Sequence, residues 1–239
     1  MKSAEKRTAD KQYIVLDLQY WDNGFEEHIH PTVLFGKEDI VLVDCGYPGS
    51  LEILESELTS HHIQPESITK LVLTHQDDDH IGAAAEIKEK YPKIQILASE
   101  KEEPYISGKL KNLRLRQAEE MQPYLPESQK EFGIRFCNRL KKVKSVSVDG
   151  ILHHGDCFDW GGGCEIIATP GHTPGHISVC SSENRYFITG DAAVLENNNL
   201  EIANPQFCLD IAAAEKSLEN IVRRKCDCYI CYHGGVFRR

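Results

Sequence analysis

The chain has 239 residues, 41% of them hydrophobic, so it is long enough to bury a substantial core. Its formal net charge of −10 argues against a nucleic-acid partner, because binding to phosphates requires clustered positive charge. No stretch reaches the roughly 18–20 uncharged apolar residues of a membrane helix, and the charged N-terminus lacks the apolar run of a signal peptide, so we expect a cytoplasmic protein with no membrane partner.

The first part of the chain alternates between strand and helix patterns. Runs of β-branched and aromatic residues bounded by turn formers predict strands at residues 12–18, 32–35, 40–44, 70–74 and 94–98. Apolar residues with helical spacing predict helices at 51–60 and 81–91.

A helical pattern covers residues 101–144, with breaks at Gly108, Pro123 and Pro126. Between residues 109 and 144 ten Lys and Arg stand against four Glu, a local net charge of +6. One interpretation is an ordinary solvated helical face. The other is a helical cover, with Tyr105, Tyr124 and Phe132, that helps to select an anionic small-molecule substrate, in which case neutralising Arg114 and Arg116 should raise KM.

Strand patterns then return and end the chain. They predict strands at residues 145–148, 163–168, 176–180, 186–189 and 227–231, with a helix at 209–223. Strands and helices thus alternate on both sides of a mostly helical segment. This order suits an α/β architecture in which two sheets pack face to face with helices on their outer sides.

Nine cysteines are scattered along the chain. Their odd number and wide spacing are typical of free thiols in a reducing compartment rather than of a disulfide framework. Cys226, Cys228 and Cys231 are close together, but no second pair of cysteines with zinc-ligand spacing accompanies them. A structural zinc site is therefore not the favoured interpretation.

The most informative segment follows the strand predicted at 70–74. His75, Asp77, Asp79 and His80 lie within six residues, directly before a predicted helix. Imidazole and carboxylate groups are the ligands that zinc, iron and manganese accept. An acidic turn that caps a helix is the alternative, but two histidines around three aspartates are more than a cap requires.

A second segment places His172 and His176 in a loop in which Pro and Gly recur. Such a loop is rigid and can hold its histidines in place, as a ligand shell requires, although a structural turn with incidental histidines is the alternative.

Three further polar residues each follow a predicted strand: Asp44, Asp191 and His233. Each is weak evidence alone, because such residues are common in turns. All five segments nevertheless lie at the carboxyl end of a strand, which is the edge where sites gather in open α/β sheets.

The order of these segments resembles the metallo-β-lactamase superfamily over residues 44–233. The resemblance implies an αββα sandwich of two sheets flanked by helices, formed as a single domain over residues 1–239, with a helical insert at about 101–144 between the second and third motifs. It also implies a binuclear metal site. One ion would be held by His75, Asp77 and His172, the other by Asp79, His80 and His233, and Asp191 would bridge them. Asp44 and His176 would support the ligands.

Residue 77 departs from the family pattern, which usually has His at this position. Two divalent ions are implied, zinc by the family. A carboxylate at Asp77 adds negative charge and an oxygen donor, which favours iron or manganese. The sequence therefore leaves the identity of the metal open among these three.

The function implied by the resemblance is a metal-dependent hydrolase that directs a metal-bridging hydroxide at an ester, thioester, lactone or related bond. Asp79 would act in catalysis by orienting the nucleophile or accepting its proton. Two alternatives stay open. Asp77 resembles the carboxylate of diiron oxygen or nitric-oxide reductases, and the basic run leaves a phosphodiesterase possible.

Overall fold

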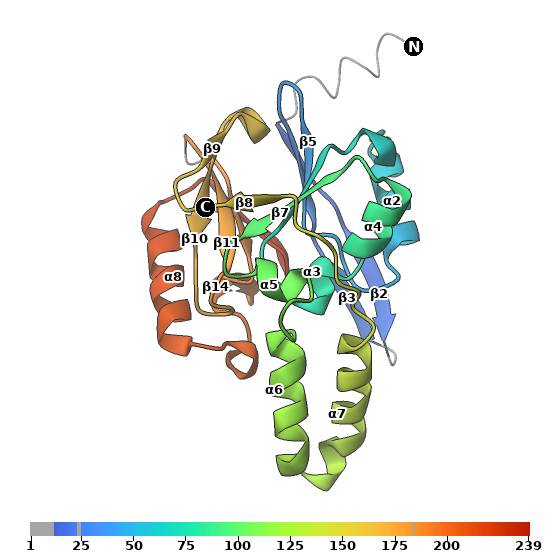
Figure 1. The fold of residues 1–239 in the computed structure, drawn as a ribbon. Coiled ribbons are helices and arrows are strands. Elements are labelled where there is room, and N and C mark those ends of the chain that lie inside the picture. Colours follow the sequence, from blue (N-terminus) through green and yellow to red (C-terminus); the bar gives the residue numbers. More distant parts are fainter. Residues whose placement is uncertain (1–11, 23–24, 184) are drawn as a thin grey trace.

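The computed structural model describes residues 12–239 except 23, 24 and 184. Their strands form two six-stranded sheets (Figure 1). In spatial order, the first sheet comprises β1 (Tyr13–Val15), β4 (Thr32–Phe35), β5 (Ile40–Val43), β6 (Lys70–Leu73), β7 (Gln95–Ser99) and β8 (Gly150–Leu152). The second comprises β16 (Gly235–Arg238), β15 (Cys228–Cys231), β12 (Phe187–Gly190), β11 (Ile177–Ser181), β10 (Cys164–Ala168) and β9 (Cys157–Phe158).

Two short hairpins and the helices complete the described chain. The hairpins pair β2 (Leu18–Asp22) with β3 (Phe25–Ile29), and β13 (Val194–Glu196) with β14 (Asn199–Glu201). The α-helices are α2 (Leu51–Ser60), α3 (Asp78–Ile81), α4 (Ala84–Lys90), α5 (Glu103–Ile106), α6 (Leu113–Met121), α7 (Glu127–Leu140) and α8 (Ile211–Arg223). Short 3-10 turns are η1 (Pro65–Ser67), η2 (Gln122–Tyr124), η3 (Trp160–Gly162) and η4 (Pro205–Phe207).

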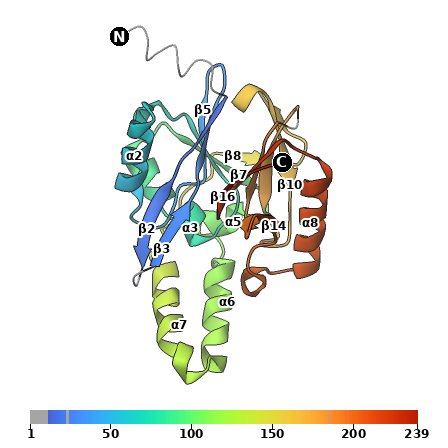
Figure 2. The ribbon, with the colours of Figure 1, turned by 180° about the vertical axis from the view of Figure 1, so that it is seen from behind.

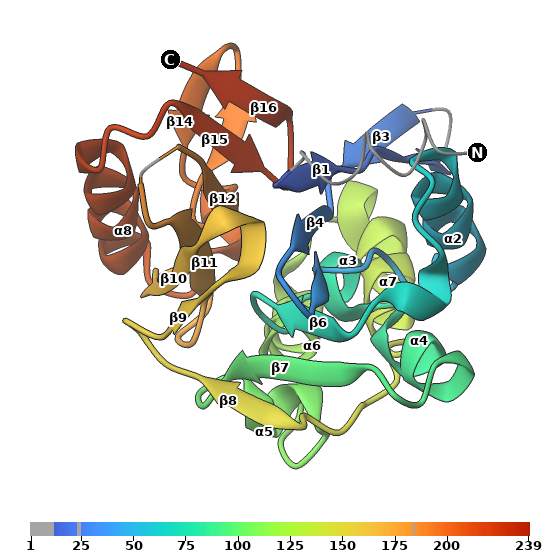
Figure 3. The ribbon, with the colours of Figure 1, turned by 90° about the horizontal axis from the view of Figure 1, so that it is seen from above.

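The core is divided into layers by the period-2 alternation of the strands. In β5, Val41 and Val43 face the second sheet and pack with residues such as Ile166 and Val179. Leu42, between them, faces the opposite side and packs with Leu54 of α2. Figure 3 shows α2 and α4 outside the first sheet and α8 outside the second. The predicted αββα sandwich is therefore confirmed.

The strand directions bring the five motif segments to one edge. β5 and β6 are parallel in the first sheet, and β12 and β15 are parallel in the second. β10 is antiparallel to β11, which is antiparallel to β12, so β10 and β12 run the same way. Because these five strands end at the same side of the sandwich, the side chains that follow them can meet.

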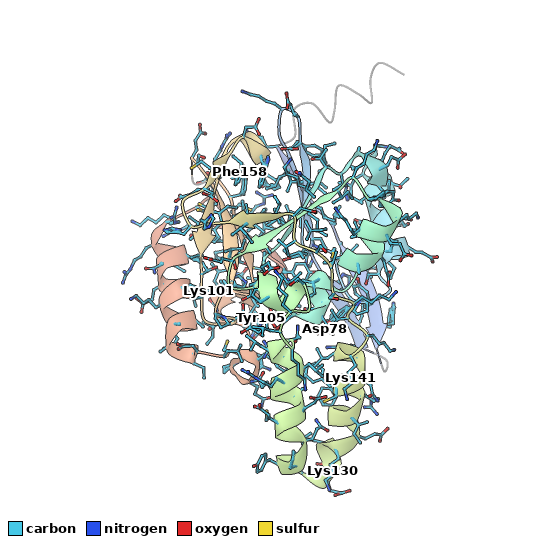
Figure 4. All side chains as sticks on the ribbon, viewed as in Figure 1. Asp78, Lys101, Tyr105, Lys130, Lys141 and Phe158 are labelled. Carbon is cyan, nitrogen blue, oxygen red and sulfur yellow. The ribbon has the colours of Figure 1, made fainter. Side chains whose placement is uncertain are left out.

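The segment at 103–140 contains α5, α6, η2 and α7, and its breaks fall at Gly108 and around Pro123 and Pro126. The helical hairpin, by which we mean α6, η2 and α7, extends away from the sandwich (Figures 1 and 2). Lys130 lies at its far end and Lys141 close to the sheets (Figure 4). Much of the basic run is thus remote from the edge of the sandwich.

No helix among residues 12–22, 25–183 and 185–239 is long and apolar enough to cross a bilayer.

The strand predicted at 12–18 is interrupted, since β1 ends at Val15 and β2 begins at Leu18 in a separate hairpin. Two further local predictions are wrong. No strand forms at 145–148, and the chain pairs with β7 only from Gly150 onwards. The N–H of Val146 is used elsewhere, since it donates to the Ile106 carbonyl, and the Val146 side chain is buried. The helix predicted at 81–91 is also interrupted. It begins early, at Asp78, and breaks after Ile81, where Gly82 lies so close to the chain that a Cβ would be 2.2 Å from Pro48 N.

Candidate metal centre

The loop after β6 presents its polar side chains in two directions. Asp77 has an extended backbone and precedes α3, and its carbonyl accepts the N–H groups of His80 and Ile81. Asp79 and His80 therefore lie inside the first turn of a helix, whereas the sequence predicted that the helix starts after them. This early start separates Asp77 from Asp79 and His80, so that each side can join a different cluster.

The structure brings all seven predicted ligand residues together in overlapping clusters. We call His75, Asp77 and His172 the first triad, and Asp79, His80 and His233 the second triad. His172 Nε2 lies 2.9 Å from Asp77 Oδ2, and His233 Nε2 lies 3.0 Å from Asp79 Oδ2. The ligand atoms within each triad are all less than 4.8 Å apart, a spacing that allows one ion to contact all three.

Asp191 lies between the two triads. Its Oδ2 is 3.5 Å from His172 Nε2 in the first triad, and its Oδ1 is 3.1 Å from His80 Nε2 and 3.5 Å from His233 Nε2 in the second. One carboxylate thus offers an oxygen to each side, which is the arrangement that a bridging ligand requires.

The chemistry of these groups fits divalent cations. His75 Nε2 and Asp77 Oδ1 are buried and have no hydrogen-bond partner among the described residues. Such atoms are costly to leave unsatisfied, and a cation supplies the missing interaction. Burial tends to raise the pKa of Asp79, but His80 and His233 hold it at about 2, so the carboxylate is ionised as a ligand must be.

Two residues around the triads hold the ligands in place. Asp44 Oδ1 accepts the Thr74 backbone N–H at 2.8 Å, and its Oδ2 is 2.8 Å from both Thr74 Oγ1 and His80 Nδ1. His176 uses both ring nitrogens, Nδ1 with Thr169 Oγ1 at 2.8 Å and Nε2 as acceptor of the Asp191 N–H at 2.9 Å. Asp44 and His176 thus make the contacts that the sequence resemblance implied for residues supporting the ligands.

Three charged residues join the helical segments to the ligand loops; the sequence indicated Arg114 only as a candidate for selecting an anionic substrate, and sequence reasoning missed Arg139 and Glu102. Arg114 of α6 donates to Asp77 Oδ2 from Nε at 3.0 Å and from Nη2 at 2.7 Å. Arg139 of α7 lies 2.7 Å from Asp78 Oδ2. Glu102 accepts the N–H groups of Gln76 and Gly175, and so links the loops that carry His75 and His172. The excess of Lys and Arg between residues 109 and 144 drew attention to the segment that contains the two arginines, but it did not indicate that Asp77 and Asp78 are their partners.

The two aspartates differ in their electrostatic surroundings. Burial tends to raise the pKa of Asp77, but Arg114, His172 and His75 hold it well below its ordinary value. Burial and the charge of Asp79 raise the pKa of Asp78 to about 7, against the opposing effect of Arg139. Asp77 is therefore anionic at neutral pH because of its cationic neighbours.

A cavity of about 800 Å³ opens over the triads. Helix α7 and η4 form an aromatic wall with Phe132, Phe136 and Phe207, and β13 adds Val194 and Leu195. Acidic residues other than the predicted ligands also line it, namely Glu26, Glu27, Asp78 and Glu196. The two lining arginines, Arg114 and Arg139, are already paired with aspartates.

Gly171, next to His172, cannot accept a side chain. Its φ is +140°, and a Cβ would lie 2.2 Å from Ala214 N in α8. We expect Gly171→Ala to lower the free energy of unfolding by at least about 2 kcal/mol, because backbone must move, and to weaken metal retention by displacing His172. Denaturant unfolding and elemental analysis measure both effects. Gly49→Ala is the matched control, since its φ is also positive but its Cβ meets nothing within 4 Å; equal losses in the two variants would contradict the argument.

A two-sheet sandwich with His and Asp clusters at the carboxyl ends of its strands defines a class of metal-binding proteins. The model of the metallo-beta-lactamase superfamily matches residues 26–233, so the chain belongs to that superfamily.

Relatives and solved structures support this assignment. The chain is 30% identical over 162 residues to the probable metallo-hydrolase YflN of Bacillus subtilis, covering 64% of this chain and 55% of YflN. It is 28% identical over 121 residues to the hydroxyacylglutathione hydrolase GloC of Haemophilus influenzae, covering 51% of this chain and 48% of GloC. The chain thus spans about half the length of these curated relatives.

The fold is similar to that of a metallo-beta-lactamase family protein from Thermus thermophilus, with a TM-score of 0.68 and 18% identity over 95% of this chain and 75% of the other. An archaeal superfamily protein from Sulfolobus tokodaii has the same TM-score, with 20% identity over 95% of this chain and 82% of the other.

Proposed function

We propose that this protein is a metal-dependent hydrolase with two divalent cations, one at each triad and Asp191 between them. The observation that carries the proposal is the position of the Asp191 oxygens, one 3.5 Å from His172 Nε2 and one 3.1 Å from His80 Nε2. Names of relatives, a probable metallo-hydrolase and a hydroxyacylglutathione hydrolase, support the reaction class. Residues 1–239 are proposed to form a single domain with its helical insert at about 101–144.

When bound, two adjacent cations lower the pKa of water towards 7 and polarise the oxygen of the bond to be cleaved. The protein's own residues position this chemistry. Asp44 orients the His80 ring through Nδ1, and His176 orients Asp191 through its backbone N–H. Asp79 Oδ2 lies 3.0 Å from His233 Nε2 within the second triad, and Asp79 is the proposed acceptor of a proton from the nucleophile.

The cavity favours an uncharged ester, thioester or lactone with an apolar acyl group. Three phenylalanines line one wall, and the acidic residues around them oppose an anionic substrate. Arg116, which the basic run suggested as an anion-binding residue, does not line the cavity and lies near Glu120 instead. The same acidic lining argues against a phosphodiester substrate.

The test is a substrate screen of the protein loaded separately with zinc, manganese and iron. Lactones, thioesters, β-lactams and phosphodiesters form the panel, and metal content is measured by elemental analysis in parallel. We expect about two ions per chain and turnover of a lactone or thioester that chelation removes. A chain without bound metal, or full turnover after chelation, would refute the hydrolase proposal.

The aromatic wall predicts how Phe136 affects substrate binding. We expect Phe136→Ala to raise KM about 10-fold for substrates with long apolar acyl chains, because burial against a phenylalanine contributes roughly 1.5–3 kcal/mol. Acetyl substrates should be affected much less. Tyr124→Ala is the control, since Tyr124 is 85% exposed and outside the cavity. An equal change in KM for short and long chains would refute the role of this wall.

A redox function is the second candidate, because the carboxylate of Asp77 adds an oxygen donor to the first triad. Oxygen consumption with NADH and rubredoxin tests it, and we expect none.

Cytoplasmic localisation is likewise proposed. It is supported by seven free thiols, which are Cys45, Cys137, Cys157, Cys164, Cys208, Cys228 and Cys231.

A further inference from the structure

Arg114 is the residue whose position the proposed function leaves unexplained. It is 2% exposed, although most arginines are on the surface. Both Nε and Nη2 donate to a single oxygen, Asp77 Oδ2, and Nη2 also lies 3.2 Å from His172 Nε2. A full positive charge is thus buried against two of the three residues of the first triad.

The start of α6 holds Arg114 in this place. Asn112 caps the helix by accepting the Leu115 N–H, and its side-chain amide donates to the Gln76 carbonyl at 2.7 Å. Leu113 N–H donates to Gln76 Oε1 at 2.6 Å. Gln76 is the residue before Asp77, so α6 is joined directly to the ligand loop. The Arg114–Asp77 contact is therefore preorganised by the backbone.

Arg114 has little capacity left for a substrate. Nε and Nη2 are used by Asp77, Nη1 donates to Gln117 Oε1, and the Phe207 ring lies 5.3 Å from the guanidinium carbon. Asp77 Oδ1, by contrast, is buried without a hydrogen-bond partner in the described part of the chain. Arg114 thus shares Asp77 Oδ2 with His172, whose Nε2 lies 2.9 Å from the same oxygen, and the pairing leaves Oδ1 without such a contact.

The charges of the pair cancel. An aspartate at residue 77 adds one negative charge relative to a neutral imidazole, and Arg114 adds one positive charge within hydrogen-bond distance. We propose that Arg114 is a positioning residue that supplies the counter-charge for Asp77, so that the two residues together replace one neutral ligand of the first triad. This inference rests on the proposed metal site. It implies that Asp77 alters metal preference through its oxygen donor and not through net charge.

A cycle of four proteins tests the pair: wild type, Asp77→His, Arg114→Met and the double variant. Each is loaded with zinc and manganese at buffered free concentrations and analysed for ions per chain. The thermal unfolding midpoint of each chelated protein is also measured.

Asp77→His alone should retain about one ion and unfold at a lower temperature, because the buried guanidinium then lacks its carboxylate partner and lies beside the imidazoles of His172 and the new histidine. We expect its first-triad affinity to fall by roughly 10- to 100-fold, the effect typical of losing support around a ligand. The double variant should recover two ions and bind zinc in preference to manganese. Arg114→Met alone should bind both zinc and manganese more tightly at the first triad than the wild type, with little change in their ratio, because the negative charge of Asp77 is then uncompensated and the two ions carry the same charge.

Arg116→Met is the matched control, since it removes the same charge from an exposed position of α6, and it should behave as the wild type. A purely structural role for Arg114 predicts that the double variant is worse than either single variant, and that result overturns the inference. So does an Asp77→His protein that binds two ions normally. Asp77→His can be tested even when it does not fold. In that case a folded double variant supports the proposed Asp77–Arg114 pairing, whereas a misfolded double variant beside a folded Arg114→Met refutes it.

The outcomes also separate the pairing from the proposed function. If the wild type binds two ions and the effects of the two substitutions simply add in the double variant, only the pairing is overturned. If the wild type binds no metal, the proposed function is overturned as well.

Discussion

Replacement of Asp191 by alanine is expected to reduce kcat/KM by at least about 10³-fold, because loss of cation-assisted stabilisation costs several kcal/mol of the barrier. The two oxygens of Asp191 approach both triads, at 3.5 Å from His172 Nε2 and 3.1 Å from His80 Nε2. Its removal also leaves the imidazoles of the two triads without the negative charge between them. Elemental analysis should therefore show that at least one ion per chain is lost.

The control for Asp191→Ala is Asp227→Ala, an exposed aspartate directly before β15. It should keep both ions and full activity, which separates the loss of a ligand from the loss of one acidic residue. His80→Ala should have an effect similar to that of Asp191→Ala. If Asp191→Ala retained two ions and wild-type kcat/KM, the proposal that Asp191 is a ligand shared by the two metal sites would be refuted.

The second large effect is expected at Asp44, which is buried and does not line the cavity. Its Oδ1 accepts the Thr74 N–H, and its Oδ2 accepts from Thr74 Oγ1 and from His80 Nδ1, each at 2.8 Å. In Asp44→Asn an amide N–H₂ must face one of these donors. We expect metal affinity at the second triad to fall about 10- to 100-fold, because partners of this kind orient the ligating histidine. Competition with a chromophoric chelator measures the change.

Asp39→Asn is a matched control for Asp44→Asn. Asp39 lies just before β5, whereas Asp44 follows the same strand, so the two are at opposite ends of it. Asp39 also accepts several hydrogen bonds, from Thr69, Lys70 and Trp160. Both variants should lower the unfolding midpoint, but only Asp44→Asn should release metal. Equal release from the two would mean that the effect reflects general instability.

Most basic side chains of the helical hairpin form an exposed face, as one of the two sequence interpretations predicted, for example Arg116 and Lys130. The outer part of the hairpin projects from the sandwich, with Lys130 at the far end (Figure 4), and Lys130 does not line the cavity. At its base, Arg114 and Arg139 pair with Asp77 and Asp78 of the ligand loop. The basic charges that matter are therefore used within the protein, and the hairpin offers the cavity aromatic side chains instead.

The sequence alone determined the architecture and the order of the site residues. Strand patterns and turn residues are local, so the strands at 40–43 and 70–73 and the helix at 51–60 could be predicted within a residue. The residues after five strands could be named because parallel strands bring their carboxyl ends to one edge. The overlapping clusters of His75, His172 and His233 follow from that rule together with the family resemblance.

Only the tertiary structure decided how the charges pair and where helices begin. Arg114 and Asp77 are 37 residues apart, and a run of ten basic residues contains nothing local that singles out one of them. Helix α3 starts early, at Asp78, and it ends next to Gly82, whose backbone lies against those of Tyr47 and Pro48. Buried ion pairs and backbone contacts of this kind are set by packing between distant segments, which periodicity and propensity do not encode.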